Sequence, residues 1–342
     1  MAIIDKPSDY FNTVIYTGNA GTQSITGVGF SPDFIWGKNR SSVTHHALVD
    51  TVRGNTKYVK SSTNAAEATI TNMVTAFGSD GFSLGADSDM NGSSANQVAW
   101  NWKAGTSFTN DASATGIGTI DSTGSVNTTS GFSIVSWTGT GSNGTIKHGL
   151  STAPKWVICK RIDADDGWWT YINSIGAGGE IILNSTSAQG SNGGVLWNST
   201  NPTSSVFSVG TNGGVNASSG TYIAYCFAEK QGYSKFGSYT GNGNADGTFV
   251  YLGFKPAFLM RKRTDSTGRW VMEDNKRDTY NVVEKAVAAN INNAEGTGGY
   301  WDVDFTAQGF KVRNNDVEIN ASGGSYIYMA FAENPFVTST GV

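Results

Sequence analysis

One apolar strand is written three times in this chain, as Val98-Ala99-Trp100-Asn101-Trp102, Ile223-Ala224-Tyr225-Cys226-Phe227 and Ile327-Tyr328-Met329-Ala330-Phe331. Each version is short and rich in aromatic and β-branched residues, which favour a β-strand. Copies of one element at wide spacing indicate an internal repeat. We therefore divide the rest of the sequence into repeats by comparing the segments that precede each copy of this strand.

Three further anchors precede each copy in the same order. The first is an aromatic-Thr-Gly turn, with its threonine at Thr17, Thr138 or Thr240. The second is a proline followed by an apolar strand that ends in basic residues, as in Pro256-Ala257-Phe258-Leu259-Met260-Arg261-Lys262. The third is a short strand such as Gly81-Phe82-Ser83-Leu84-Gly85. Four anchors in a constant order indicate three related units.

The anchors divide the chain into six parts. These are an N-terminal docking segment (1–13), repeat 1 (14–104), a Gly/Ser/Thr-rich stretch (105–131), repeat 2 (132–232), repeat 3 (233–336) and a C-terminal tail (337–342). The stretch between repeats 1 and 2 has a composition that fits either a linker or an added hairpin.

Within each repeat the apolar residues alternate or form short solid runs. Turn sequences such as Gly241-Asn242-Gly243 separate these runs and favour hairpins. The sequence therefore predicts an all-β protein of three sequence-related antiparallel β-sandwich or barrel-like units, each of about 100 residues, in tandem. In an alternative arrangement the three units share one core around a pseudo-threefold axis. One helix is predicted, from Thr279 to Ala294, because its apolar residues are spaced for one helical face.

Composition excludes several classes of protein. The 342 residues include 44 Gly without a three-residue period, and only 15% are charged, which excludes collagen and coiled coils. A net charge of −4 argues against a nucleic-acid partner, and no apolar run reaches the ~20 residues that span a bilayer. The first 13 residues lack the pattern of a secretion signal, so synthesis in the cytoplasm is expected. Cys159 and Cys226 are expected to be buried thiols, with one disulfide as the alternative.

The sequence indicates no catalytic residues. It contains three histidines, of which His148 fits a structural turn and the adjacent pair His45-His46 would point to opposite faces of a strand. No nucleophile elbow, P-loop or zinc-protease motif is present. We therefore expect no enzyme. The alternative is glycoside hydrolysis by paired carboxylates, for which Asp163, Asp165 and Asp166, or Asp302 and Asp304, are candidates beside tryptophans.

A calcium loop is the only metal site that the sequence suggests. Asp87, Asp89 and Asn91, followed by Gly92, place oxygen ligands at alternate positions as in a calcium-binding loop. The glutamate of an EF-hand is missing. The other repeats do not repeat the acids, since 211–216 in repeat 2 is neutral and repeat 3 has only Asp316 and Glu318 nearby. No cofactor other than this calcium ion is predicted, and a plain polar turn is the alternative.

Aromatic pairs suggest a surface for sugars. Adjacent residues on a strand point to opposite faces, so one ring of Trp168-Trp169 and one of Tyr300-Trp301 would be exposed on a one-sided sheet. We take these four residues as candidate glycan-binding residues; the alternative is that they belong to the core.

Basic residues concentrate in repeat 3. Arg261, Lys262, Arg263 and Arg269 stand out in an acidic chain and form a candidate patch for an anionic partner such as a polysaccharide or a lipopolysaccharide phosphate. The alternative is a solvated pair of strands.

The anchors resemble a repeat found in virion proteins of tailed, mainly marine, bacteriophages. The resemblance rests on phrases such as Pro32-Asp33-Phe34-Ile35-Trp36, Asp50-Thr51-Val52-Arg53-Gly54 and Gly232-Tyr233-Ser234-Lys235-Phe236-Gly237, and extends over residues 14–336. Repeat 2 departs from it, since Asn173–Gly176 stands where the other repeats have an acid and an arginine, so a role of that pair cannot be threefold.

The resemblance implies a non-enzymatic structural protein on the virion surface. It would be a tail or head fibre protein that binds host-surface glycan, or a capsid-decorating protein with a mechanical role; a glycan-degrading tail spike is a third alternative. Other virion proteins would be its partners, and a homotrimer is expected by analogy. Within the N-terminal segment we expect four apolar residues to dock on the virion: Ile3, Ile4, Tyr10 and Phe11.

Overall fold

The computed structural model of the chain describes residues 4–335, so Ile3 and the predicted tail at 337–342 lie outside the described residues. The predicted all-β class is confirmed, because the described residues form antiparallel sheets joined by turns and a few one-turn helices. No helix within this range is long and apolar enough to cross a membrane.

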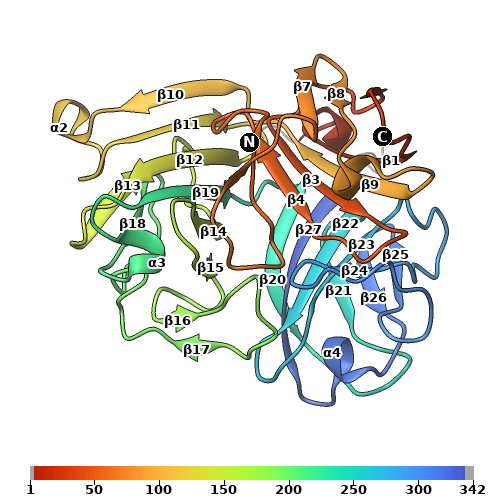
Figure 1. Ribbon diagram of the computed structural model, residues 1–342. Helices are drawn as coiled ribbons and strands as arrows, with labels where there is room; N and C mark the ends of the chain where they lie inside the picture. The colour runs from red at the N-terminus through yellow and green to blue at the C-terminus, as the bar shows by residue number, and fades with distance from the viewer. Residues whose placement is uncertain (1–3, 336–342) are drawn as a thin grey trace, which may run out of the picture.

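Each repeat contributes one main sheet (Figure 1). In that sheet the last strand of the repeat lies between two others and pairs with both: β9 with β1 and β3, β19 with β12 and β14, and β27 with β20 and β22. The orders are β1-β9-β3-β4 in main sheet 1, β10-β11-β12-β19-β14-β15 in main sheet 2 and β20-β27-β22-β23-β24 in main sheet 3, with antiparallel pairing throughout. The bounds in sheet 1 are β1 Phe11–Thr17, β3 Phe34–Asn39, β4 Ala47–Asp50 and β9 Asn96–Trp102. Those in sheet 2 are β10 Thr106–Asn110, β11 Ser122–Asn127, β12 Phe132–Thr138, β14 Trp156–Arg161, β15 Trp168–Ile172 and β19 Thr221–Phe227. Those in sheet 3 are β20 Ser234–Thr240, β22 Phe254–Arg263, β23 Trp270–Asp274, β24 Val287–Ala288 and β27 Ser325–Pro335.

The stretch 105–131 is an added hairpin and not a linker. Its strands β10 and β11 extend main sheet 2 by pairing with β12, and the one-turn helix α2 (Ala112–Thr115) lies between them. Among residues 4–335, main sheets 1 and 3 have no such addition, so β1 and β20 are edge strands.

A small outer sheet packs on each main sheet and makes every repeat a two-layer sandwich. The outer sheets are β2-β8-β7 in repeat 1, β13-β18 in repeat 2 and β21-β26-β25 in repeat 3, each with a separate apolar cluster beneath it. Their bounds are β2 Gln23–Ile25, β7 Val74–Gly78, β8 Gly81–Leu84, β13 Gly144–Lys147, β18 Val206–Val209, β21 Phe249–Tyr251, β25 Val303–Thr306 and β26 Gly309–Val312. Two short hairpins, β5 Lys57–Tyr58 with β6 Ala68–Thr69 and β16 Gly179–Glu180 with β17 Gly190–Ser191, lie in loops.

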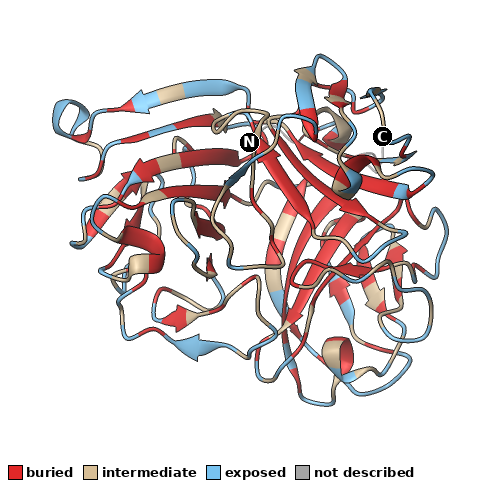
Figure 2. Cartoon of the chain, viewed as in Figure 1, coloured by how far each residue is buried: buried red, intermediate tan, exposed pale blue. Residues whose placement is uncertain are grey.

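The opposite faces of the three main sheets meet in one central core (Figure 2), so the alternative of a shared core is correct. At its middle lie Trp102, Phe227 and Phe331, which occupy the same position in the three central strands. Their ring centroids are 6.2, 5.7 and 6.0 Å apart and each pair meets edge to face, a favourable aromatic geometry. These three equivalent rings mark a pseudo-threefold axis.

A buried asparagine ends a one-turn helix in every repeat. The helices are α1 (Ser88–Asn91), α3 (Gly213–Asn216) and α4 (Val317–Asn320), and each final asparagine is fully buried. The side-chain oxygens of Asn91, Asn216 and Asn320 accept the backbone N–H of Asn19, Thr140 and Asn242 at 2.8, 2.8 and 3.0 Å. The asparagine thereby fixes the turn that follows the first strand of its repeat.

Buried lysines connect the repeats in a closed cycle. Lys38 donates to Asn292 O of repeat 3 (3.5 Å), Lys160 to Asn64 O of repeat 1 (3.1 Å) and Lys262 to Thr186 O of repeat 2 (3.2 Å). All three are at most 1% exposed, and burial lowers the pKa of each ammonium to about 8.

Hydrogen bonds from ring nitrogens connect the repeats in the same cyclic order. Trp168 Nε1 donates to Lys60 O of repeat 1 at 2.9 Å, and Trp270 Nε1 donates to Ile182 O of repeat 2 at 3.1 Å. The equivalent residue of repeat 1 is His46, whose Nδ1 accepts the indole N–H of Trp36. Its Nε2 therefore holds the ring proton and donates it to Ala288 O of repeat 3 at 3.0 Å.

Two of the three seams, as we call the contact zones between neighbouring repeats, contain a buried acid–arginine pair, and the third does not. In seam 1–2, Tyr225 of repeat 2 donates to Asp50 Oδ2 (2.9 Å), which also accepts from Arg53 Nε (2.6 Å). In seam 3–1, Trp100 of repeat 1 takes the place of the tyrosine and donates to Asp274 Oδ2 at 3.0 Å.

In seam 2–3 the strand register places Ile172 opposite Trp156, as Asp50 is opposite Phe34 and Asp274 opposite Phe258. The residues at the acid and arginine positions are therefore Ile172 and Ile175, one position earlier than the sequence comparison with Asn173–Gly176 indicated. In repeat 3 the residue equivalent to Tyr225 and Trp100 is Met329, whose side chain has no N–H or O–H group to donate. The acid, the arginine and the donor are thus replaced together.

One sequence prediction about a chain segment is wrong. The expected helix at 279–294 is absent: Val283 bridges to Val303, Ala286 bridges to Gly296, and the segment contains β24. The described part of the N-terminal segment contains the one-turn helix η1 (Pro7–Asp9), after which β1 begins at Phe11. The cysteines are free and buried, as expected.

Candidate functional site

A pocket on repeat 3 brings together residues that the sequence analysis had assigned to two different surfaces. Its volume is about 560 Å³. Tyr300 and Trp301 come from the loop before β25, and Arg269 from the turn before β23. Asp316 and Glu318 come from the start of α4. The lining is completed by Glu284, Gly296, Thr297 and Gly298.

The indole of Trp301 is held on two sides. Its Nε1 donates to Glu318 Oε2 at 3.0 Å, and the guanidinium of Arg269 lies 5.4 Å from its ring centroid. Arg269 also donates to the same carboxylate oxygen at 3.2 Å. A ring fixed in this way loses little conformational freedom when a ligand packs on it.

A buried ion pair fixes the backbone beneath this ring. Arg261 is paired with Glu273 inside repeat 3, and its guanidinium donates to Trp301 O at 2.8 Å. Burial raises the pKa of Glu273, whereas the adjacent carboxylate raises that of Arg261, so the arginine remains charged. Arg261 therefore positions the pocket from behind and does not face solvent.

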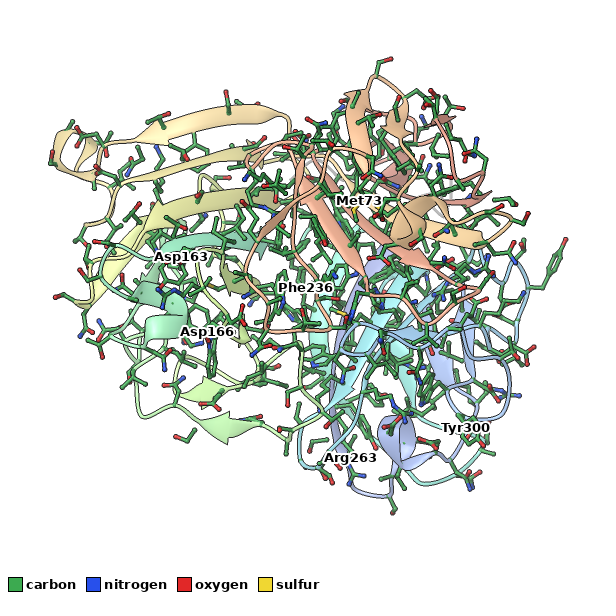
Figure 3. All side chains as sticks on the ribbon, in the orientation of Figure 1. Met73, Asp163, Asp166, Phe236, Arg263 and Tyr300 are labelled. Atoms are coloured by element: carbon green, nitrogen blue, oxygen red, sulfur yellow. The ribbon has the colours of Figure 1, made fainter. Side chains whose placement is uncertain are left out.

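The open side of the pocket combines an exposed aromatic ring with carboxylates. Tyr300 is 67% exposed and lies on the outer side of repeat 3 (Figure 3). Three carboxylates, those of Glu284, Asp316 and Glu318, line the pocket together with one guanidinium, that of Arg269. Aromatic rings pack against the C–H faces of sugars, and carboxylates accept hydrogen bonds from hydroxyl or ammonium groups. The arrangement suits an uncharged or amine-bearing sugar better than an anionic one.

The predicted sugar-binding pair of repeat 2 does not form such a site. Trp168 is fully buried in the central core, so the prediction is wrong for this residue. Trp169 does point to the other face, but its Nε1 donates to Asp166 Oδ1 at 2.9 Å and its ring packs against the outer cluster of repeat 2. Strand β15 is covered on both faces, which a period-two pattern alone does not reveal.

The predicted anionic-partner patch is not a patch. Arg261 and Lys262 are at most 1% exposed, because β22 is covered on both faces, and both donate to groups within the protein. Arg263 forms a fork with both oxygens of Asp265, at 3.0 and 3.1 Å. Of the four residues, Arg269 lines the Trp301 pocket, where it lies beside carboxylates.

Asp87 and Asn91 of the predicted calcium loop form hydrogen bonds within the protein. Asn91 is fully buried, and its Nδ2 donates to Gly21 O and Gly85 O at 2.7 Å while its oxygen accepts the Asn19 N–H. Asp87 caps α1 by accepting the backbone N–H of Asp89 at 3.0 Å. Within residues 4–335 no group of three or more His, Cys, Asp and Glu side chains could hold a metal ion. The polar turn is what the structure contains at this position.

The described residues of the predicted docking segment pack on the protein itself. Ile4 and Phe11 belong to the central core, and Phe11 stacks on Phe331 with centroids 5.0 Å apart. Tyr10 is half-buried and contacts Tyr233 edge to face. For Ile4 and Phe11 the docking prediction is wrong, since their side chains are buried.

The remaining catalytic candidates have structural partners. His148 Nδ1 accepts the N–H of Leu150 and its Nε2 pairs with Thr203 O, as expected for a turn residue. Asp163 is paired with Arg161 at 3.0 Å, and Asp304 with Arg313 at 3.2 Å.

Sequence reasoning did not connect Glu284 and Glu318 with Trp301. In the sequence Glu318 is only one of two acids near the calcium-loop position of repeat 3, and Glu284 lies within the expected helix. The only signal that could have found them is the position of α4, which each repeat places before its last strand.

No curated protein matches the chain. A family described as "Domain of unknown function (DUF7483)" matches residues 6–335, and the chain belongs to this family.

Proposed function

We propose that this protein is a non-enzymatic structural component exposed on a phage particle, and that the Trp301 pocket binds host-surface glycan. The virion part of the proposal is supported by the resemblance of the anchor sequences to virion proteins of tailed phages. The binding part is supported by one observation: a pre-positioned indole beside an exposed tyrosine and three carboxylates in an open pocket.

Binding is tested on an array of bacterial surface glycans with wild-type protein and three variants. Trp301→Ala and Tyr300→Ala each remove an aromatic contact worth about 0.5–1.5 kcal/mol beyond area burial, so affinity should fall about 3- to 10-fold or more. Tyr280→Ala is the matched control, because Tyr280 is an 84% exposed tyrosine of the same repeat that does not line the pocket. Equal losses in all three variants would contradict the assignment of the pocket.

The place on the particle is tested by electron microscopy with a gold-labelled antibody. Label on the tail or on fibres would support host recognition. Uniform label over the head would favour the second candidate, a capsid-decorating protein, which the closed cycle of contacts between repeats supports because it suits a mechanical role. Absence of label would contradict the virion proposal. Release of reducing sugar from host polysaccharide would instead favour the third candidate, a glycan-degrading spike.

A further inference from the structure

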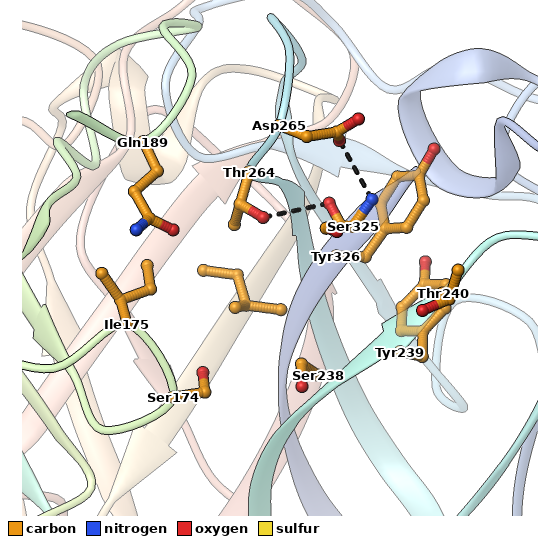
Figure 4. A pocket seen from close by; sticks show the side chains of 11 residues that line it. Ser174, Ile175, Gln189, Ser238, Tyr239, Thr240, Thr264, Asp265, Ser325 and Tyr326 are labelled. Carbon is orange, nitrogen blue, oxygen red and sulfur yellow. Dashed lines mark hydrogen bonds between the residues drawn. The ribbon is translucent and has the colours of Figure 1, made fainter. Parts of the chain in front are cut away.

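Seam 2–3 contains a cavity where the other seams contain charged side chains. In seam 1–2, Arg53 pairs with Glu67 at 3.3 Å, and in seam 3–1, Arg277 pairs with Glu295 at 3.1 Å. In seam 2–3 the arginine position is Ile175. The residue at the glutamate position is Gln189. Its backbone N–H donates to Thr264 O, just as the backbone N–H of Glu67 donates to Ile162 O. A cavity of about 570 Å³ lies there (Figure 4).

Side chains from both repeats face one another across this cavity (Figure 4). Repeat 2 contributes Ser174, Ile175 and Gln189, which lie opposite the strands of repeat 3. Ile327 belongs to the central core and also lines the cavity. Repeat 3 contributes the remaining lining residues: Ser238, Tyr239, Thr240, Thr264, Asp265, Ser325 and Tyr326.

Several lining groups keep their hydrogen-bonding capacity for a ligand. Within residues 4–335, no side chain or backbone group hydrogen-bonds to the side chains of Ser174, Gln189, Ser238 or Ser325. These groups supply hydroxyl and amide donors and acceptors in a shared space.

The cavity is electrically neutral. Its one carboxylate, Asp265, is neutralised by the fork from Arg263 and accepts the backbone N–H of Ser325 at 3.0 Å. The two tyrosine hydroxyls are turned away, since Tyr239 donates to Ile319 O and Tyr326 to Val317 O, both at 2.8 Å.

The geometry points to a second saccharide site in seam 2–3, one that takes an uncharged sugar residue. Hydroxyl and amide groups from two repeats surround isoleucine side chains, and a sugar presents the complementary surface: a ring of hydroxyls around apolar C–H faces. A charged sugar would have no unpaired counter-charge in the cavity. This site is separate from the Trp301 pocket and does not depend on it.

The test uses the full chain with Trp301→Ala, so that binding at the other pocket does not contribute. Saturation-transfer NMR is recorded with glucose, galactose, mannose and N-acetylglucosamine at about 10 mM, which fills most of any site with a dissociation constant of about 1 mM. Glucuronate and glucosamine are the charged comparators. We expect transfer to at least one uncharged sugar and weaker transfer to the charged ones.

Two added substitutions locate the site. Ser238→Trp places a large ring at the mouth of the cavity and should abolish the transfer. Ile15→Trp is its matched control, because Ile15 occupies the same position of β1 opposite Val98 that Ser238 occupies in β20 opposite Ile327. Both residues are exposed on edge strands, where tryptophan is compatible with the strand.

A third variant covers the case that Ser238→Trp does not fold. Gln189→Ala removes only an exposed amide and should weaken binding several-fold. The inference is overturned if no uncharged sugar shows transfer. It is also overturned if the folded Ser238→Trp and Gln189→Ala variants bind as the Ile15→Trp control does.

Discussion

Substitution of Tyr225 by phenylalanine tests whether the charged seams stabilise the protein. The hydroxyl of Tyr225 donates to Asp50 Oδ2 at 2.9 Å and accepts from the guanidinium of Arg53 at 3.1 Å, in a fully buried position. Tyr225→Phe removes both hydrogen bonds and leaves the ring in place, where it stacks on Phe34 with centroids 4.1 Å apart.

The expected cost follows from the charge of the partners. Hydrogen bonds to charged groups contribute about 1.5–3 kcal/mol each. Asp50 keeps the Nε and backbone N–H of Arg53, at 2.6 and 2.9 Å, so its carboxylate is not left unpaired. We therefore expect the free energy of unfolding to fall by about 2–3 kcal/mol, nearer to one such bond than to two. With an unfolding entropy of about 2.1 cal/mol/K per residue, Tm falls by about 3–4 °C for this chain length.

Urea unfolding followed by tryptophan fluorescence and by circular dichroism measures this change. The control is Tyr233→Phe, since Tyr233 is equally buried but no described residue hydrogen-bonds its hydroxyl. Removal of that hydroxyl should leave stability unchanged or raise it. If Tyr225→Phe costs no more than Tyr233→Phe, the stabilising role assigned to seam 1–2 is refuted.

Three further outcomes are expected. The pKa values of Lys38, Lys160 and Lys262 are about 8 in the folded chain, whereas the ordinary value is 10.5. Above pH 8 the unfolded chain therefore binds more protons than the folded chain, so Tm should rise between about pH 8 and about pH 9.5, and a steady fall of Tm would contradict this. Asn320→Ala removes an amide NH2 that donates among three acceptors and an oxygen that accepts one hydrogen bond, and should cost about 3–4 kcal/mol in denaturant unfolding. A cost below about 1 kcal/mol would show that the asparagine is dispensable. Addition of EDTA should leave Tm unchanged, because the Asn91 amide is already satisfied by the backbone, whereas a drop in Tm that calcium reverses would restore the calcium loop.

Local signals in the sequence were sufficient for the strands and for the repeat. Turn residues and strand-sized apolar runs act over a few residues, so the three copies of the central strand could be found without knowledge of contacts, whereas composition left 105–131 open between a linker and an added hairpin. The shared core was open as an alternative. The sequence could not decide between separate units and a shared core, because strands such as β3 are buried on both faces and show no alternation that distinguishes an inner from an outer side.

The errors arise where distant segments decide the environment of a residue. Val283 and Ala286 are spaced as on a helix, but each bridges to a different partner, at Val303 and Gly296. Arg261 belongs to a basic run in the sequence, yet Glu273 on the neighbouring strand holds it in the interior. The candidate pocket was found only in part, since Tyr300, Trp301 and Arg269 stood out by residue type while Glu318 becomes relevant only once α4 folds beside them.

The cycle of lysine contacts has a consequence for synthesis of the chain. Lys38 and its acceptor Asn292 are 254 residues apart. At about 5–20 residues per second, a ribosome needs roughly 13–50 s to make the intervening chain. During that time the inner face of main sheet 1, with Phe34 and Trp100, has been made before its partners exist. The inner face of nascent repeat 1 therefore stays uncovered until later strands are made, and β27 completes the environment of β1, where Phe331 stacks on Phe11.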